Sequence, residues 1–106
     1  MKLKDRVAII VGGGSGIGRA SALLLAKEGA KLMLCDWVIE SADKVAEEIR
    51  ADGGEVFTFP MDMTDEEQCI DMAKRAIEKY GKIDILCNIA GGSMGAGIRD
   101  GLQPFI

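Results

Sequence analysis

A glycine-rich turn between an apolar run and a helical pattern restricts this chain to few folds. Residues 7–11 are continuously apolar and rich in β-branched side chains, which is typical of a strand buried on both faces of a parallel sheet. Residues 12–18 contain five glycines in seven positions, and residues 19–27 carry apolar side chains at helical spacing up to Gly29. This order of strand, tight turn and helix predicts the first unit of an α/β fold with a parallel sheet.

The rest of the chain repeats the alternation of strand and helix. Further strands are predicted at 31–35, 55–59 and 83–87, and a helix at 41–51. A capping box with Thr64 at the N-cap and Glu67 three residues later predicts a third helix that ends at Gly81. The apolar stripe expected to face the core on that helix is Ile70, Ala73, Ile77 and Tyr80. Alternation with short turns predicts parallel strands joined by right-handed crossovers.

Charge and cysteine content exclude several classes of partner. The net charge of −4 provides no basic field for nucleic acid. No segment has the apolar length of a membrane span or of a signal peptide, so we expect a cytoplasmic protein without a membrane partner. Cys35, Cys69 and Cys87 have no Cys-x-x-Cys spacing and the chain has no His, so we expect reduced thiols and no metal site. Cys35 and Cys87 lie in apolar runs and are expected to be buried.

The glycine turn has the chemistry of a phosphate-binding loop. The first N–H groups of a helix lack partners within the helix and can donate to a pyrophosphate, which the helix dipole also favours. Glycines at positions 12, 16 and 18 let the backbone turn sharply and approach such a ligand closely. The alternative is a flexible turn without a ligand.

Asp36 ends the second predicted strand, 18 residues after Gly18. A carboxylate at this point can accept hydrogen bonds from the adenosine ribose hydroxyls of a dinucleotide. It would repel a 2′-phosphate, and Trp37, the next residue of the predicted cofactor site, brings no positive charge. The pattern therefore favours NAD over NADP. The alternative is an Asp that only forms a turn at a strand end.

Four motifs in order resemble the short-chain dehydrogenase/reductase family. The segment Val-Gly-Gly-Gly-Ser-Gly-Ile-Gly at 11–18 resembles that family's Thr-Gly-x-x-x-Gly-Ile-Gly fingerprint. Asp62 and Met63 resemble its adenine-contact pair, and Asn-Ile-Ala-Gly at 88–91 resembles its Asn-Asn-Ala-Gly motif, preceded by the matching Asp84. The resemblance extends over residues 3 to about 97 and implies a Rossmann-type doubly wound parallel sheet, here truncated to four strands in the order 3-2-1-4 with three helices.

The resemblance implies a role for each matching residue. It assigns the pyrophosphate and nearby ribose to Gly12, Ser15, Gly16, Ile17 and Gly18, the adenosine ribose to Asp36, the adenine to Asp62 and Met63, and the path toward the nicotinamide ribose to Asn88, Ala90 and Gly91. Asp62 as a simple strand terminator and Ala90-Gly91 as a tight turn are the alternatives. Residues 1–91 are then the dinucleotide-binding half-domain, and residues 92–106 a glycine-rich, loosely ordered tail. Val11 and Ile89 depart from the family's Thr and Asn, and both departures remove a side-chain hydrogen bond.

The family's catalytic residues have no counterpart in this chain. The family transfers hydride between nicotinamide and an alcohol or carbonyl, using a Tyr, a Lys four residues later, a Ser and an Asn. The only Tyr is Tyr80, four residues before Asp84, and its place on the apolar stripe predicts packing instead. We therefore expect the cofactor-binding portion of an NAD-dependent oxidoreductase that is inactive as this 106-residue chain.

The strand order implied by the resemblance leaves the fourth strand as an apolar edge. An unpaired edge and an open sheet face predict self-association into a homo-oligomer. One alternative is a non-catalytic, self-associating interaction module that reuses the fold. Another is a different nucleotide-binding enzyme, such as a methyltransferase-like or epimerase-like domain, which Asp36 and residues 88–91 disfavour.

Overall fold

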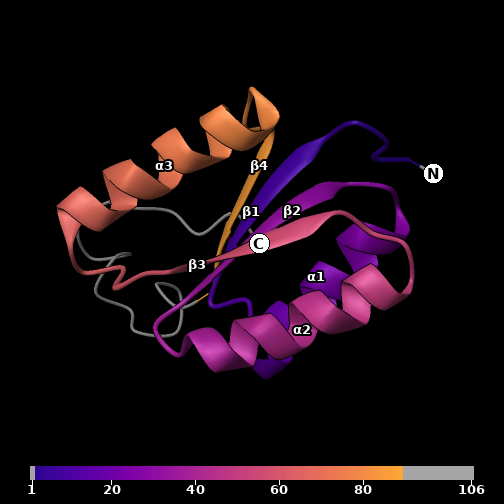
Figure 1. The fold of residues 1–106 in the computed structure, drawn as a ribbon, viewed down its shortest axis with the longest axis horizontal. Helices are drawn as coiled ribbons and strands as arrows, with labels where there is room; N and C mark the ends of the chain where they lie inside the picture. Colours follow the sequence, from indigo (N-terminus) through magenta and orange to yellow (C-terminus); the bar gives the residue numbers. More distant parts are fainter. Residues whose placement is uncertain (1, 90–106) are drawn as a thin grey trace.

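The computed structural model describes residues 2–89 as alternating strands and helices in three layers (Figure 1). Along the chain these elements are β1 (Val7–Val11), α1 (Gly16–Lys27), β2 (Lys31–Asp36), α2 (Ile39–Ala51), β3 (Val56–Pro60), α3 (Glu66–Tyr80) and β4 (Ile85–Asn88). The predicted tail at 92–106 lies outside the described residues, as do Ala90 and Gly91.

All described strand pairs are parallel, in the order β3-β2-β1-β4. The register sets Val11 opposite Cys35 on one side and opposite Asn88 on the other. The predicted order 3-2-1-4 and the α/β class are confirmed. Each crossover passes through a helix because parallel neighbours cannot be joined by a tight hairpin.

The helices cover the sheet from both sides. Figure 1 shows α1 and α2 on one face and α3 on the other. Alternate strand residues therefore enter two cores: Ile10 and Leu34 pack with α1 and α2, whereas Ile9 and Met33 pack beneath α3. All four are at most 1% exposed, as expected for strands buried on both faces.

The predicted core face of α3 is wrong for its two isoleucines, whereas Tyr80 packs toward the sheet. Ile70 and Ile77 are 49% and 52% exposed, and the helix instead buries Met72 and Ala76. Two apolar stripes overlap on this helix, and only one can face the sheet. Tyr80 lies at the end of both stripes, and its hydroxyl donates to the backbone oxygen of Leu32 at 3.0 Å.

Helix starts also differ from the sequence prediction. Asp65, not Thr64, is the N-cap of α3, and its Oδ1 accepts from the backbone N–H groups of Glu67 and Gln68 at 3.0 and 3.3 Å. Thr64 is unavailable because its hydroxyl donates to Asp62. Helix α1 begins at Gly16, three residues earlier than predicted, because Ser15 caps it.

Strand β4 forms one edge of the sheet within residues 2–89, where it pairs with β1 alone. Its side chains are half-buried, including Cys87, whereas Cys35 in β2 is fully buried. The burial prediction is therefore confirmed for Cys35 and holds only in part for Cys87. Burial raises the pKa of the Cys35 thiol to about 12, which leaves it an unreactive neutral side chain. No helix among these residues is long and apolar enough to cross a membrane.

Candidate functional site

The predicted site residues meet at the carboxyl ends of the strands. Gly12 follows β1, Asp36 ends β2, Asp62 follows β3 and Asn88 ends β4. Strand β2 pairs with one side of β1 and β4 with the other, so the direction in which successive strands are added to the sheet reverses at β1. Ligands of doubly wound sheets bind in the crevice that forms at such a reversal.

The glycine turn is held tightly against β2. The backbone N–H groups of Gly12 and Gly13 both donate to the Cys35 oxygen, at 2.7 and 3.1 Å. Gly12 has φ of 89°, a conformation that favours glycine. A Cβ on Gly18 would overlap the Gly12 oxygen, so this glycine lets α1 approach the turn. Gly12 and Gly18 are therefore needed by the fold itself.

The first turn of α1 leaves donors available to a ligand. Ser15 Oγ accepts from the Gly18 N–H at 3.1 Å and donates to the Gly12 oxygen at 2.8 Å. Within residues 2–89, the backbone N–H groups of Gly16 and Ile17 have no acceptor. The first turn carries no acidic side chain, and a Cβ on Gly16 would meet no atom within 4 Å. This helix end has the open backbone donors that an anion requires.

Asp36 lies beside this helix end and is half-buried. Its Oδ2 accepts from the Gly14 N–H and its Oδ1 from the Val38 N–H, both at 2.9 Å. A carboxylate offers about four lone-pair sites, so two of these remain for ribose hydroxyls. Trp37 and Val38 are 72% and 49% exposed and form an apolar surface next to it.

Asp62 is held as an ionised acceptor in the loop after β3. Its Oδ1 accepts from the Thr64 hydroxyl at 2.6 Å and from the Thr64 N–H at 2.9 Å, and these hydrogen bonds lower the pKa of the Asp62 carboxyl. Its backbone N–H donates to Gln68 Oε1 at 2.7 Å, which ties the loop to α3. Met63 is half-buried against the core beneath α3.

Asn88 reaches the same crevice from β4, opposite Val11. The next residue, Ile89, is only 8% exposed and packs in the core on the α1 and α2 side. The apolar departure from the family motif therefore adds to the core, a role that the sequence analysis missed. The alternation of side chains along a strand places residues 85, 87 and 89 on one face and was the available signal.

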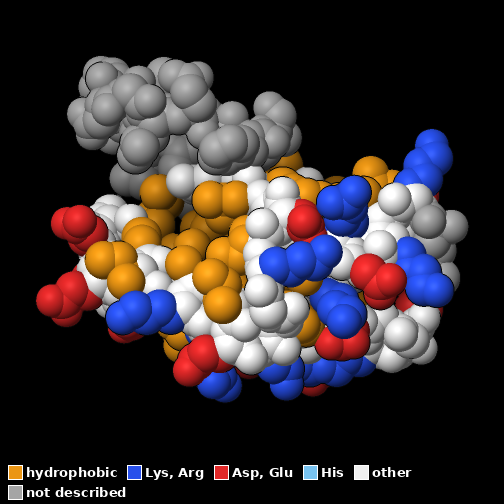
Figure 2. Space-filling model, turned by 90° about the horizontal axis from the view of Figure 1, so that it is seen from above, with side chains coloured by type: hydrophobic (Ala, Val, Ile, Leu, Met, Phe, Trp, Pro, Cys, Tyr) orange, Lys and Arg blue, Asp and Glu red, His pale blue; other side chains and the backbone are white. Residues whose placement is uncertain are grey.

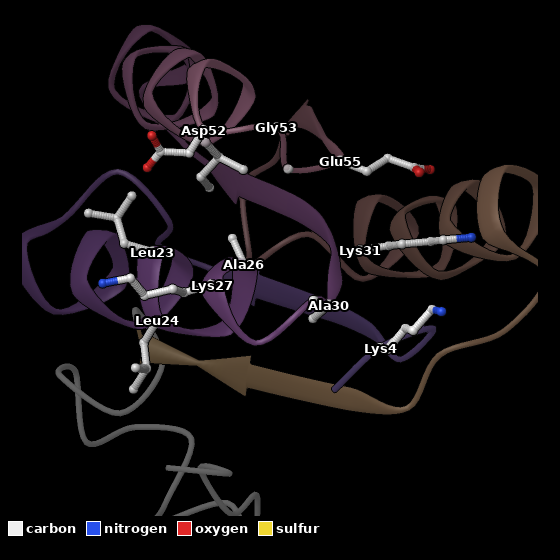
Figure 3. A pocket seen from close by; sticks show the side chains of 13 residues that line it. Lys4, Leu23, Leu24, Ala26, Lys27, Ala30, Lys31, Asp52, Gly53 and Glu55 are labelled. Carbon is white, nitrogen blue, oxygen red and sulfur yellow. The ribbon is translucent and has the colours of Figure 1, made fainter. Parts of the chain in front are cut away.

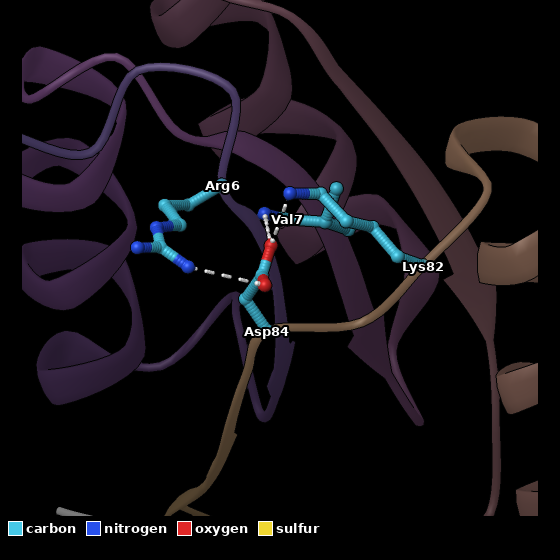
Figure 4. A network of polar contacts seen from close by, with 4 residues as sticks. All are labelled: Arg6, Val7, Lys82 and Asp84. Atoms are coloured by element: carbon cyan, nitrogen blue, oxygen red, sulfur yellow. Dashed lines mark hydrogen bonds and ion pairs between the residues drawn. The ribbon is translucent and has the colours of Figure 1, made fainter.

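Asp84 positions β4, and with it Asn88, against β1 (Figure 4). Its Oδ2 accepts from the Val7 N–H at 2.9 Å, and its own N–H donates to the Val7 oxygen at 2.9 Å. Arg6 and Lys82 approach the same carboxylate at 3.5 and 3.1 Å. The hydrogen bond from Val7, followed by that from Lys82, lowers the pKa of the Asp84 carboxyl.

We expect Asp84→Asn to destabilise the chain in a pH-dependent way. Because the pKa of Asp84 is lower in the folded state, its stabilising contribution is complete above its unfolded pKa of about 4 and disappears as pH falls through the folded value. Urea unfolding at several pH values should show the variant less stable at pH 7 and the difference shrinking in acid. A difference that does not change with pH would contradict this role.

Tyr80 is engaged in packing, as predicted. Its hydroxyl bonds Leu32, its ring meets Phe57 edge to face at 5.4 Å between centroids, and burial raises its pKa to about 12. A proton donor or acceptor for neutral-pH catalysis needs a pKa nearer 7 and access to a substrate. Tyr80 has neither.

A cavity of about 920 Å³ lies at the opposite end of the strands, near their amino ends (Figure 3). It is lined by the ends of α1 and α2 and the starts of β2 and β3. Figure 3 shows the amines of Lys27 and Lys31 pointing in opposite directions. These two lysines therefore do not converge on one point, as the polar groups of a ligand site usually do.

Comparisons with known proteins agree on one family. The family model described as short chain dehydrogenase matches residues 6–103. An uncharacterised oxidoreductase of Listeria monocytogenes is 43% identical over 91 residues, which cover 86% of this chain and 37% of that protein. The 3-oxoacyl-[acyl-carrier-protein] reductase of Thermotoga maritima is 37% identical over 91 residues, with the same coverage of 86% and 37%.

A solved structure extends the likeness to three dimensions. It is a 7α-hydroxysteroid dehydrogenase complexed with NADH and 7-oxo glycochenodeoxycholic acid, with a TM-score of 0.80 and 39% identity. The match covers 82% of this chain and 34% of that one. The chain thus spans well under half the length of these relatives.

Proposed function

The chain belongs to the short-chain dehydrogenase family, and on this premise we propose that it is the NAD-binding portion of an oxidoreductase acting on an alcohol or carbonyl. The observation that carries the proposal is the start of α1, where two open N–H groups lie beside a glycine with free space around it. An anion fits there because the first turn of α1 carries no acidic side chain.

Different site residues would bind different parts of the cofactor. The N–H groups of Gly16 and Ile17 would hold the pyrophosphate, the Asp36 carboxylate the adenosine ribose, and Asp62 and Met63 the adenine. Asn88, with Ala90 and Gly91, would line the nicotinamide end. When bound, the nicotinamide supplies the hydride acceptor or donor of the reaction.

We propose NAD rather than NADP as the cofactor. The Asp36 carboxylate would face the 2′ position and repel a phosphate. Arg19, the basic residue nearest the glycine turn in the sequence, is directed to α2, where it makes two hydrogen bonds with Glu48 at 2.9 and 2.6 Å. The guanidinium is thus paired with a carboxylate of α2 and is directed toward Glu48.

We propose that this chain does not transfer hydride by itself. Its one Tyr is engaged with Leu32 and Phe57, and it has no His to serve as a base at neutral pH. One of its relatives is named a 3-oxoacyl-[acyl-carrier-protein] reductase and another is solved with 7-oxo glycochenodeoxycholic acid, so the substrate is not assigned. A cytoplasmic location is proposed because the three cysteines of residues 2–89 are free thiols.

Calorimetric titration tests the cofactor proposal. We expect saturable binding of NAD, and NADP binding that is weaker by about tenfold or more, a difference of ~1.4 kcal/mol, because the Asp36 carboxylate repels a 2′-phosphate. Asp36→Ala should weaken NAD binding about 10- to 100-fold through loss of charge-assisted hydrogen bonds. Glu47→Ala, which removes an exposed charge from α2, is the matched control. No heat with the unaltered chain at millimolar NAD would favour the interaction module instead.

We also propose that the chain self-associates through its open α3 and β4 side. Ile70 and Ile77 lie exposed on α3 with Ala73 between them, and Leu86 of β4 is half-buried. Figure 2, seen from the α3 side, shows hydrophobic side chains gathered into a continuous patch. Such a patch favours contact with a second copy because burial removes apolar area from water.

Sedimentation over a wide concentration range measures this association. The unaltered chain should form dimers or larger species, and Ile77→Lys should shift it to monomer. Leu24→Lys, on the exposed face of α1, alters an equally apolar residue on the other side of the sheet and should leave the association unchanged. A monomer at high concentration, or equal effects of both variants, would refute the proposal.

A further inference from the structure

Asp36 joins two loops that come from different parts of the chain. Its Oδ2 accepts from Gly14 in the turn between β1 and α1, and its Oδ1 accepts from Val38 just before α2. Gly14 is 22 residues away in sequence. One carboxylate therefore connects the start of the first helix with the start of the second.

The start of α2 depends on this contact. Val38 is the N-cap of α2, and its side chain makes no capping hydrogen bond. Residues that cap well carry a side-chain oxygen, which Val lacks. Asp36 lies two residues before the N-cap of α2, and its carboxylate accepts from the Val38 N–H, so it takes up a donor that would otherwise face solvent at this helix end.

The same point is closely packed. A Cβ on Gly14 would overlap Ser41 Cβ and come within 2.9 Å of the Ala42 nitrogen, so the turn rests directly on the first turn of α2. Gly14 is therefore held on one side by α2 and on the other by a hydrogen bond to Asp36. The Gly14 N–H has no other acceptor among residues 2–89.

We propose that Asp36 is a positioning residue for the glycine turn, in addition to the ribose contact proposed above. It sets the turn and the start of α2 in place before any ligand arrives. The open N–H groups of Gly16 and Ile17 are then aimed by Asp36, although it does not touch them. Hydrogen bonds from N–H groups to a carboxylate are among the stronger ones in proteins, so their loss frees the turn.

Amide exchange tests this role without any ligand. We expect the Gly14 and Val38 amides to exchange about tenfold faster or more in Asp36→Ala than in the unaltered chain, because each loses a charge-assisted acceptor. Asp36→Asn keeps one carbonyl oxygen and should protect only one of the two amides. In the control Glu47→Ala, the Gly14 and Val38 amides should both exchange as slowly as in the unaltered chain. Unchanged protection of Gly14 and Val38 in Asp36→Ala, with the fold intact by circular dichroism, would overturn the proposal.

Binding of inorganic pyrophosphate gives a second test. A positioning role of Asp36 and a purely electrostatic effect of its charge predict opposite changes in pyrophosphate affinity. Removing a carboxylate next to an anion site should strengthen anion binding if charge alone acts. If Asp36 positions the turn, Asp36→Ala should weaken pyrophosphate binding several-fold, while Glu47→Ala should leave it unchanged or slightly tighter. Stronger binding to Asp36→Ala would overturn the positioning role.

The pyrophosphate arm rests on the proposed function, and the exchange arm does not. If the unaltered chain fails to bind pyrophosphate or NAD, the proposed function fails, and amide exchange still decides the positioning role. If it binds both and exchange is insensitive to Asp36, the positioning role fails alone.

Discussion

Gly18→Ala should strongly destabilise the chain. The added Cβ would overlap the Gly12 oxygen and lie 2.8 Å from the Gly12 carbonyl carbon and 3.0 Å from Gly13 Cα, all backbone atoms. They cannot move away easily, because Gly12 and Gly13 both donate to the Cys35 oxygen of the central sheet. Overpacking against fixed backbone costs about 3 kcal/mol or more, a large part of the ~5–15 kcal/mol that stabilises a typical domain.

Thermal unfolding followed by circular dichroism measures this effect. A loss of about 3 kcal/mol lowers the midpoint of a domain of this size by roughly 12–24 °C. Gly16→Ala is the matched control, since it adds the same methyl group two residues earlier on the same helix. A Gly18→Ala melting temperature within a few degrees of the unaltered chain would show that the turn can relax away from α1.

The order and pairing of the strands follow from the sequence because burial on both faces leaves a clear signature. Residues 7–11 are apolar without a break, and the structure buries every one of them. The glycine turn and Asp36 fall at the carboxyl ends of neighbouring strands because parallel strands bring those ends to one edge. Local pattern and global topology agree here, so the fold and the place of the site could be predicted.

The face of α3 could not be predicted because two apolar stripes share the helix. Ile70 and Ile77 have the better helical spacing of large side chains, yet Met72 and Ala76 face the sheet. Packing of the whole helix against the sheet, and not local spacing, decides between them. The N-cap shows the same limit, since Thr64 and Asp65 are both good capping residues and a contact with Asp62 engages Thr64.

The second role of Asp36, as an acceptor for Gly14 and Val38, also could not be predicted from the sequence. Spacing after the glycine turn identifies a carboxylate at the end of the second strand. It does not show that the carboxylate already accepts from Gly14 and Val38, because those contacts depend on how two loops meet. Sequence thus indicates which residues form the site, and the structure shows which of them also hold it together.

Gly16→Ala should have the opposite effect to Gly18→Ala on stability and a large effect on cofactor binding. Gly16 is the first residue of α1, and its φ is not among the positive values of the described glycines. A Cβ there meets no atom within 4 Å. Ala restricts the unfolded chain and favours a helix, so the free energy of unfolding should rise by up to ~1 kcal/mol.

The same methyl group would lie beside the open N–H groups of Gly16 and Ile17, where the backbone must approach a pyrophosphate closely. We expect NAD affinity to fall by about tenfold or more, measured by calorimetry on a variant whose melting temperature is unchanged or higher. An NAD affinity equal to that of the unaltered chain would indicate that the pyrophosphate does not bind at this turn. Since nothing in the described fold requires a glycine at position 16, a loss of binding without a loss of stability would mean that this glycine serves the ligand, whereas Gly18 serves the fold.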